Sequence, residues 1–287
     1  MKLSYLIKAS AVAITVAAVI APFSFLKPPK SDVSSTAEPL KQPSQEVVKA
    51  VPKKPVVVEK PLHNVALPDF ANIRDVKEKK RQFFAFLRPA VEKENASIMI
   101  DRQQVETIIN KLSLEEPLAD MEGVFLSQMA KKYRVSSRFS QLHQAHLLLD
   151  KIDIIPVELV LVQAANESAW GTSRFARIGL NFFGIWCYNK GCGMVPSGRN
   201  VGAKHEVEAF KSVEDAVHRY TENINRNNAY VMFRTLRAQL RDNDEPLSAE
   251  VLATGLLAYS ERGIDYVLEL SQMIRHNHQY FVQAQAE

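Results

Sequence analysis

Glu167 is the residue of this sequence whose surroundings best suit an acid catalyst. It lies two residues after a mostly apolar run, 159–165, and is followed closely by Ala169 and Trp170. Burial among apolar neighbours raises the pKa of a carboxyl group, and so does the negative end of a helix dipole. A raised pKa lets a carboxylic acid give a proton to a leaving group near neutral pH. On composition alone, a solvated glutamate in the last turn of an amphipathic helix explains the same pattern.

Two further acids, Glu206 and Glu208, lie in an alternating run from Val201 to Phe210. The alternation predicts a small β-hairpin lobe within 185–210 and places both carboxylates on the same face of a strand. They are candidates for a second catalytic carboxylate, and two solvated strand carboxylates are the alternative. The histidines show no spacing typical of a metal site, so we expect neither a metal nor a cofactor.

Cys187 and Cys192 are the two cysteines of the chain and flank the segment 189–191, Asn-Lys-Gly. In an oxidising compartment this spacing suits a disulfide across a turn. Two sulfurs without a nearby His or Cys pair make a weak zinc site. We therefore expect a disulfide, and free, partly buried thiols are the alternative.

The elements that position these groups are predicted to be mostly helices, because apolar residues recur at three- and four-residue intervals from about residue 69 onward. The first predicted helix ends near Pro89, since proline removes a backbone donor. Pro156 opens the helix that carries Glu167, and Gly171 is its expected C-cap. The other predicted helices cover about 91–112, 117–133, 138–150, 229–241, 248–258 and 264–280. The predicted fold is mainly α, a helical core with a small β-hairpin lobe over a cleft.

A further helix start is predicted at Ser212, because Asp215 follows it three residues later. This spacing matches a capping box with Asp in place of the usual Glu.

The N-terminal part of the chain differs in composition from the rest. Residues 9–26 carry no charge, which predicts a membrane anchor or a signal peptide within 1–26. Residues 27–65 hold seven of the fourteen prolines and are predicted to form an extended linker. Residues 66–287 carry 27 basic and 28 acidic side chains, which argues against a nucleic-acid partner. We expect a helical region over 66–150 and the main domain over 151–287.

A family resemblance strengthens the assignment of Glu167. The segment 163–171, Gln-Ala-Ala-Asn-Glu-Ser-Ala-Trp-Gly, and the segment 181–185, Asn-Phe-Phe-Gly-Ile, resemble the signature of the glucosaminidase family of lysozyme-like peptidoglycan hydrolases. The resemblance is tighter to the Bax-type group of gram-negative bacteria, on the segments 186–193, 205–210 and 229–241. It implies a lysozyme-like α+β fold with Glu167 as the catalytic acid.

The resemblance also implies roles for residues around Glu167. The family places a second acid in the β-hairpin lobe, for which we prefer Glu206, although the family's acid usually comes earlier, where this chain has Arg199 and Asn200. Tyr266 aligns with a tyrosine that lines the family's sugar site, where its hydroxyl could hold the substrate's acetamido group or the attacking water. The residues expected to bind substrate are Trp186, Tyr188, Asn181 and Tyr259.

The expected activity is hydrolysis of the β-1,4 bond after N-acetylglucosamine in the glycan strands of peptidoglycan. A lytic transglycosylase also uses a lone Glu-Ser pair, but usually with a Gly-Leu-Met-Gln element, in whose place this chain has Asn-Phe-Phe-Gly-Ile. A non-catalytic wall-binding protein is the alternative from another class. The expected location is the periplasm, with the N-terminal segment tethering the protein to the inner membrane.

Overall fold

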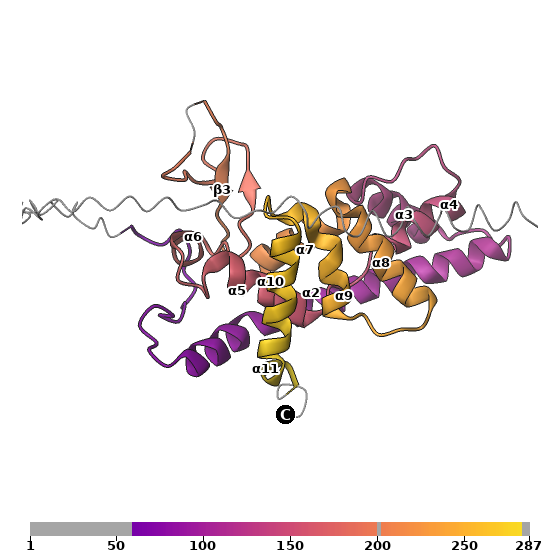
Figure 1. Cartoon of the computed structure of the whole chain (residues 1–287). Helices are drawn as coiled ribbons and strands as arrows, with labels where there is room; N and C mark the ends of the chain where they lie inside the picture. The colour runs from indigo at the N-terminus through magenta and orange to yellow at the C-terminus, as the bar shows by residue number, and fades with distance from the viewer. Residues whose placement is uncertain (1–58, 200–201, 283–287) are drawn as a thin grey trace, which may run out of the picture. The chain divides into compact units, whose positions relative to one another are not determined.

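The computed structural model of the chain describes residues 59–199 and 202–282, which are mainly helical with one small sheet (Figure 1). This confirms the predicted mainly α class with a small β lobe. Helical turns η2 and η3 connect α7 with α8 and α9 with α10. The elements are α2 (Val76–Ser113), α3 (Asp120–Lys132), α4 (Gln141–Leu149), α5 (Val157–Ser168), α6 (Arg174–Gly179), β1 (Trp186–Cys187), β2 (Gly193–Met194), β3 (Glu206–Glu208), α7 (Val213–Arg226), η2 (Asn228–Tyr230), α8 (Val231–Asp242), α9 (Ala249–Ala253), η3 (Thr254–Tyr259), α10 (Ile264–Asn277) and α11 (Gln279–Val282).

The long helix α2 runs through Pro89, so the predicted helix end at this proline was wrong. Pro89 and Ala85, whose carbonyl loses its helical partner, are both exposed. Water can therefore satisfy that carbonyl, which removes much of the penalty for proline inside a helix. Leu87 and Val91, on the two sides of Pro89, are buried and hold the helix against the core.

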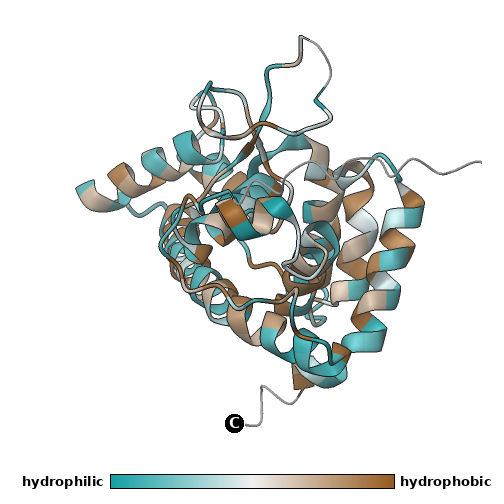
Figure 2. Ribbon diagram, turned by 90° about the vertical axis from the view of Figure 1, so that its left-hand side faces the viewer, coloured by the Kyte–Doolittle hydropathy of each residue, from teal (hydrophilic) through white to brown (hydrophobic). Residues whose placement is uncertain are grey.

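Two apolar clusters stabilise the described residues, and α2 contributes to both. Its first half packs with α5, α7 and α10 in the main cluster, and its second half packs with α3 and α4 in a smaller one. The helices carry hydrophobic and hydrophilic residues in alternating patches, as their colours in Figure 2 show. The helix α5 is buried along 159–165, so the scaffold that carries Glu167 is rigid.

Ser168 is the last residue of α5, three positions before the predicted C-cap. Ala169, Trp170 and Gly171 all have left-handed backbone conformations. A larger residue would not fit in place of Gly171, because its Cβ atom would lie 2.5 Å from Cδ2 of Phe70. The hydroxyl of Ser168 donates to the carbonyl of Ala164 and accepts from the N–H of Gly171 at 2.8 Å, which stabilises this turn directly after Glu167.

The sheet has the strand order β1-β3-β2, with β3 antiparallel to both neighbours. Cys187 lies opposite Glu206, and Gly193 lies opposite Glu208. The small β lobe predicted within 185–210 is confirmed, but it is a three-stranded sheet rather than a hairpin, because the run 201–210 contributes only β3 and its partner strands come from 186–194. Gly193 permits this pairing, since a Cβ atom there would lie 1.9 Å from the carbonyl oxygen of Val207.

Arg237 of α8 fixes the loop that leads into α5. Its guanidinium is buried and donates to the carbonyls of Asp150, Asp153 and Ile154 and to the side chain of Asn225. The carboxylate of Asp153 also accepts two hydrogen bonds from Arg241, so its buried charge is balanced. These contacts set the position where α5 begins.

The described end of the predicted linker packs on the domain. Glu59 forms an ion pair with Arg174 of α6, and the N–H of Leu62 donates to the carbonyl of Ile178 at 2.8 Å. The predicted membrane segment, 9–26, lies outside the described residues. Within 59–199 and 202–282, no helix is both long and apolar enough to cross a membrane.

Candidate active site

Glu167 lies one residue before the end of α5, and its side chain is only partly buried. Burial raises the pKa of its carboxyl group above the ordinary value, and the negative charge of Glu269 adds to this rise. A hydrogen bond from the hydroxyl of Tyr266 and the charge of Arg262 lower the pKa and offset part of the effect. The pKa of Glu167 is thus raised, as its apolar neighbours in the sequence predicted. Trp170, one of those neighbours, packs against Phe83 and Phe84 in the core.

The turn that contains Gly184 brings the backbone close to the carboxylate of Glu167. Gly184 has φ +66°, and a Cβ atom at this position would lie 3.6 Å from Oε2 of Glu167. Asn181 holds the turn that contains Gly184: its side-chain nitrogen donates to the carbonyls of Ile185 and Glu208, and its oxygen accepts from the N–H groups of Phe183 and Ile185. Both donors and both lone pairs of the amide are therefore used within the protein. We assign Asn181, expected to bind substrate, to positioning this turn.

Four tyrosines from different elements surround the acid. Tyr220, Tyr230, Tyr259 and Tyr266 all lie near enough for the charge of Glu167 to raise their pKa values, with burial as the largest cause. The rings of Tyr259 and Tyr266 stack with centroids 5.7 Å apart. The hydroxyl of Tyr259 donates to the carbonyl of Phe183 at 2.8 Å, so Tyr259 also supports the turn beside Glu167.

Sequence reasoning missed Tyr220 and Tyr230, together with the charged pair Arg262 and Glu269. Arg262 lies over the ring of Tyr266 at 5.4 Å and forms an ion pair of 2.7 Å with Glu269. These residues come from α7, η2, α10 and the loop before α10, and they meet only in the folded chain.

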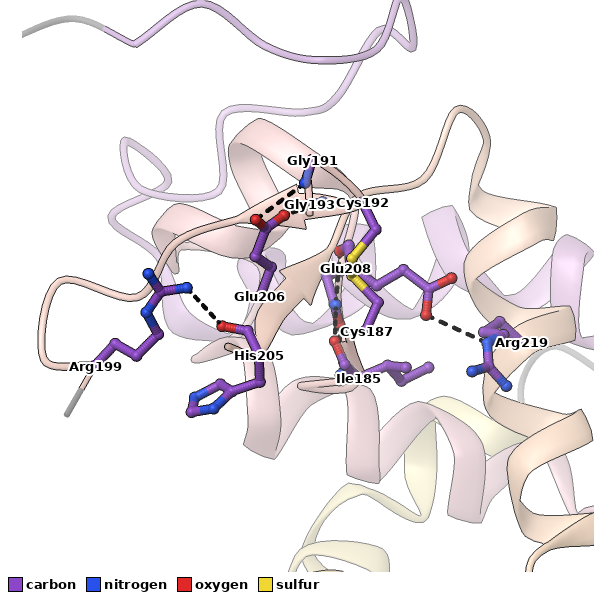
Figure 3. The surroundings of a disulfide bond; sticks show 11 residues. Ile185, Cys187, Gly191, Cys192, Gly193, Arg199, His205, Glu206, Glu208 and Arg219 are labelled. Carbon is purple, nitrogen blue, oxygen red and sulfur yellow. Dashed lines mark hydrogen bonds and ion pairs between the residues drawn. A yellow bond between two sulfur atoms is a disulfide. The ribbon is translucent and has the colours of Figure 1, made fainter. Parts of the chain in front are cut away.

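The carboxylate of Glu206 is buried within the lobe (Figure 3). It accepts hydrogen bonds from the N–H groups of Gly191 at 3.1 Å and Gly193 at 3.0 Å, and these bonds lower its pKa. Glu208 instead pairs with Arg219 of α7 at 3.2 Å. Both strand acids thus have partners that hold the lobe. Activation of water by Glu206 stays a prediction.

We expect Glu206→Gln to weaken the lobe without removing the chemistry. An amide nitrogen in place of one carboxylate oxygen would face an N–H donor, so one hydrogen bond is lost. KM for glycan strands should rise while kcat changes little, and Glu214→Gln, at an exposed acid in the first turn of α7, is the control that should change neither value. A loss of about 100-fold or more in kcat would instead assign Glu206 to water activation.

A disulfide joins Cys187 and Cys192, whose Cα atoms are 6.2 Å apart. Together with Glu206, these two residues form a cluster of possible metal ligands among the described residues. Sulfurs bonded to each other are not thiolates, and thiolates are the form that binds metal. The disulfide and the carboxylate of Glu206 therefore hold one loop, 187–193, from both sides.

The aromatic residues of the lobe are exposed. Trp186 is 52% exposed and Tyr188 is 72% exposed. The indole of Trp186 stacks on the imidazole of His205, with centroids 4.2 Å apart and planes at 12°. Arg199 donates to the carbonyl of His205 at 3.1 Å and so supports the segment under this stack (Figure 3). Of the residues expected to bind substrate, Trp186 and Tyr188 are open to a ligand, whereas Asn181 is buried and the hydroxyl of Tyr259 donates to the protein's own backbone.

Two hollows are found elsewhere in the described residues. One of about 250 Å³ lies between α4 and α8 and includes Asp153 and Arg237, whose polar groups stabilise the loop before α5. A wider one of about 720 Å³ lies beside the start of α3. Neither includes Glu167, so the substrate cleft over this residue stays a prediction.

Comparisons with known proteins agree with this arrangement. Residues 142–279 match the Glucosaminidase family, described as mannosyl-glycoprotein endo-beta-N-acetylglucosaminidase. The chain is 32% identical over 213 residues to Protein bax of Escherichia coli (strain K12), which covers 74% of each chain. No solved structure gave a significant match. The chain therefore belongs to the glucosaminidase family, as a Bax-type member.

Proposed function

We propose that this protein is an endo-β-N-acetylglucosaminidase that hydrolyses the β-1,4 bonds of peptidoglycan, with Glu167 as its general acid. The observation that carries the proposal is the raised pKa of Glu167 in a partly buried position, next to a donor hydroxyl on Tyr266. Membership of a glycosidase family and peptidoglycan as the substrate of that family support it. The open aromatic side chains of Trp186 and Tyr188 provide surfaces on which sugar rings can stack.

In this mechanism, the carboxyl proton of Glu167 passes to the glycosidic oxygen while the bond between that oxygen and C1 breaks. The released sugar leaves as an alcohol, and C1 becomes electron-poor. Because Glu206 and Glu208 are engaged within the lobe, the substrate's acetamido oxygen is the group that takes up this charge. Water then adds to C1 and returns a proton to the carboxylate of Glu167.

The two alternatives leave different products. A lytic transglycosylase would close the sugar on itself and leave anhydro-muramyl ends, and a wall-binding protein would leave the strands uncut. Purified protein should be incubated with sacculi, and the new chain ends should be reduced with borohydride and identified. We expect reduced N-acetylglucosamine, whereas anhydro ends would replace the hydrolase assignment with the transglycosylase.

We also propose that the domain works in the periplasm, tethered by residues 9–26. The disulfide between Cys187 and Cys192 supports an oxidising compartment, where such bonds persist. We expect both cysteines to resist alkylation in protein taken from growing cells without reduction, and to react after reduction. Full alkylation without reduction would contradict this location.

A further inference from the structure

Arg262 and Glu269 form a charged pair beside Glu167. Arg262 lies in the loop before α10, and its guanidinium forms an ion pair of 2.7 Å with the carboxylate of Glu269 on that helix. The side-chain nitrogen of Asn166, the residue before Glu167, donates to the same carboxylate at 3.5 Å. Burial is the largest cause of the raised pKa of Glu167, and the charges of Arg262 and Glu269 act on it in opposite directions. The pair therefore lies at the end of α5 that carries the acid.

The guanidinium of Arg262 is also held over the ring of Tyr266. Its Cζ atom lies 5.4 Å from the ring centroid. Tyr266 is buried, and its hydroxyl is hydrogen-bonded at 2.9 Å to the side chain of Gln163 on α5. Gln163 lies one helical turn before Glu167. Two separate sets of contacts, one through Asn166 and one through Gln163, thus place the cation next to the last turn of α5.

The ion pair of Arg262 is open to solvent. The side chain of Arg262 is 52% exposed and that of Glu269 is 40% exposed. A pair this exposed contributes little to the stability of a fold, because water screens both charges. Among residues 59–199 and 202–282, Glu269 is the one group with which this guanidinium forms a hydrogen bond or ion pair. At least three of its five N–H donors therefore remain for a ligand.

The chemistry of the substrate indicates which anion comes to this position. Hydrolysis after N-acetylglucosamine makes the muramyl sugar the leaving group, so the oxygen that Glu167 protonates is O4 of that sugar. The neighbouring ring carbon carries a lactyl ether on O3, which ends in a carboxylate or continues into a stem peptide. Because O3 and O4 are on adjacent carbons, a group bound to O3 has to lie next to the acid.

We propose that Arg262 binds the carboxylate that the leaving sugar carries through O3, and that this contact favours muramyl strands over chitin-like strands, which have a hydroxyl at O3. A guanidinium can bind a carboxylate with two parallel hydrogen bonds, a geometry that lysine cannot provide. This role rests on the proposed function, because only cleavage after N-acetylglucosamine puts the muramyl sugar on the leaving side.

The test is a cycle between one protein group and one substrate group. The protein change is Arg262→Gln, in full-length protein that also carries Glu167→Gln so that it does not consume the ligand. The substrate change is reduction of the carboxylates to alcohols, by carbodiimide and borohydride, on soluble glycan strands stripped of stem peptides. Isothermal titration calorimetry measures the affinity of each protein for each ligand.

Arg262→Gln should weaken the binding of unreduced strands about tenfold. Reduction of the carboxylates should weaken binding to protein with Arg262 by the same factor, and the two changes together should cost no more than either alone. Arg262→Lys should recover part of the affinity, because it keeps the charge without the planar group. An equal effect of Arg262→Gln on reduced and unreduced strands, or no effect on either, overturns the inference.

Arg275→Gln is the matched control. Arg275 lies in the last turn of α10 and forms an ion pair with Glu250, and these side chains are 56% and 40% exposed, much like the pair at Glu167. Eleven residues of helix place it about 16 Å along the axis from Ile264. The substitution removes a similar ion pair and should leave every affinity unchanged. A loss as large as that of Arg262→Gln would assign the effect to surface charge in general and overturn the inference.

Two further ligands identify the source of the carboxylate. A loss with stripped strands but not with peptide-bearing strands assigns the lactyl carboxylate, and the reverse assigns a carboxylate of the stem peptide. Chito-oligosaccharides have no carboxylate, so they should bind equally well with and without Arg262. A tenfold loss with chito-oligosaccharides overturns the inference.

Cleavage tests the proposed function separately. In protein with Glu167 intact, Arg262→Gln should lower kcat/KM on unreduced strands about tenfold, mainly through a higher KM. If the wild type cuts no glycan strands, the proposed function fails, and the calorimetry still decides whether Arg262 binds the carboxylate.

Discussion

Glu167→Gln should keep the fold and abolish cleavage of peptidoglycan. Glutamine has nearly the same shape and can still accept a hydrogen bond from Tyr266, so the packing of α5 should survive. It has no proton acidic enough to give to the glycosidic oxygen, and the loss of general acid catalysis lowers the rate by roughly 10²–10⁴-fold. Release of soluble fragments from sacculi measures the activity, and a thermal melt measures the stability.

Glu158→Gln is the matched control, because Glu158 lies in the first turn of the same helix, nine residues before Glu167. It should leave the rate at the wild-type level. Folded Glu167→Gln protein that clears sacculi at a near-wild-type rate would remove Glu167 from the mechanism.

The pH dependence of the wild type follows from the same residue. A general acid must be protonated, so the rate should fall as the pH rises through the pKa of Glu167. Burial raises this pKa above the ordinary value of a glutamate. The alkaline limb should therefore lie at a higher pH than an exposed carboxyl group would give.

Tyr266→Phe should give the second largest loss, about 10- to 100-fold in kcat. The substitution keeps the ring that stacks on Tyr259 and removes the hydroxyl that donates to Glu167. The ionised form of Glu167 loses a hydrogen bond, so its pKa rises and it becomes a weaker acid. The expected signature is a lower kcat together with an alkaline limb moved to higher pH.

This signature distinguishes Tyr266 from a residue that only packs. A lower melting temperature with an unchanged kcat and pH profile would show that the hydroxyl serves the fold alone. A rise in KM with kcat unchanged would place the hydroxyl on the bound substrate instead of on the acid.

Local sequence patterns predicted most of the helices, because helix periodicity and helix capping depend on neighbours along the chain. The apolar run before Glu167 indicated a buried helix, and the Ser212–Asp215 spacing located the start of α7, where the hydroxyl of Ser212 accepts from the N–H of Asp215. Pro89 misled the prediction because a proline ends a helix only when its lost hydrogen bond cannot be replaced.

The contacts around the acid were harder to predict, because they join distant parts of the chain. The motif residues Asn181 and Glu206 were selected by type, but a residue type does not say whether its side chain faces a substrate or the protein's own backbone. Asn181 holds the turn beside Glu167, and Glu206 holds the disulfide loop. Tyr220 reaches the site only through the packing of α7 on the core.

The most direct test of the central claim is to let the wild type and Glu167→Gln digest sacculi in water enriched in ¹⁸O and to identify the new ends by mass spectrometry. Hydrolysis by the wild type should produce reducing N-acetylglucosamine ends that carry oxygen from the solvent, and Glu167→Gln should produce almost none. Anhydro-muramyl ends without solvent oxygen, or equal yields from both proteins, would contradict an N-acetylglucosaminidase that depends on Glu167.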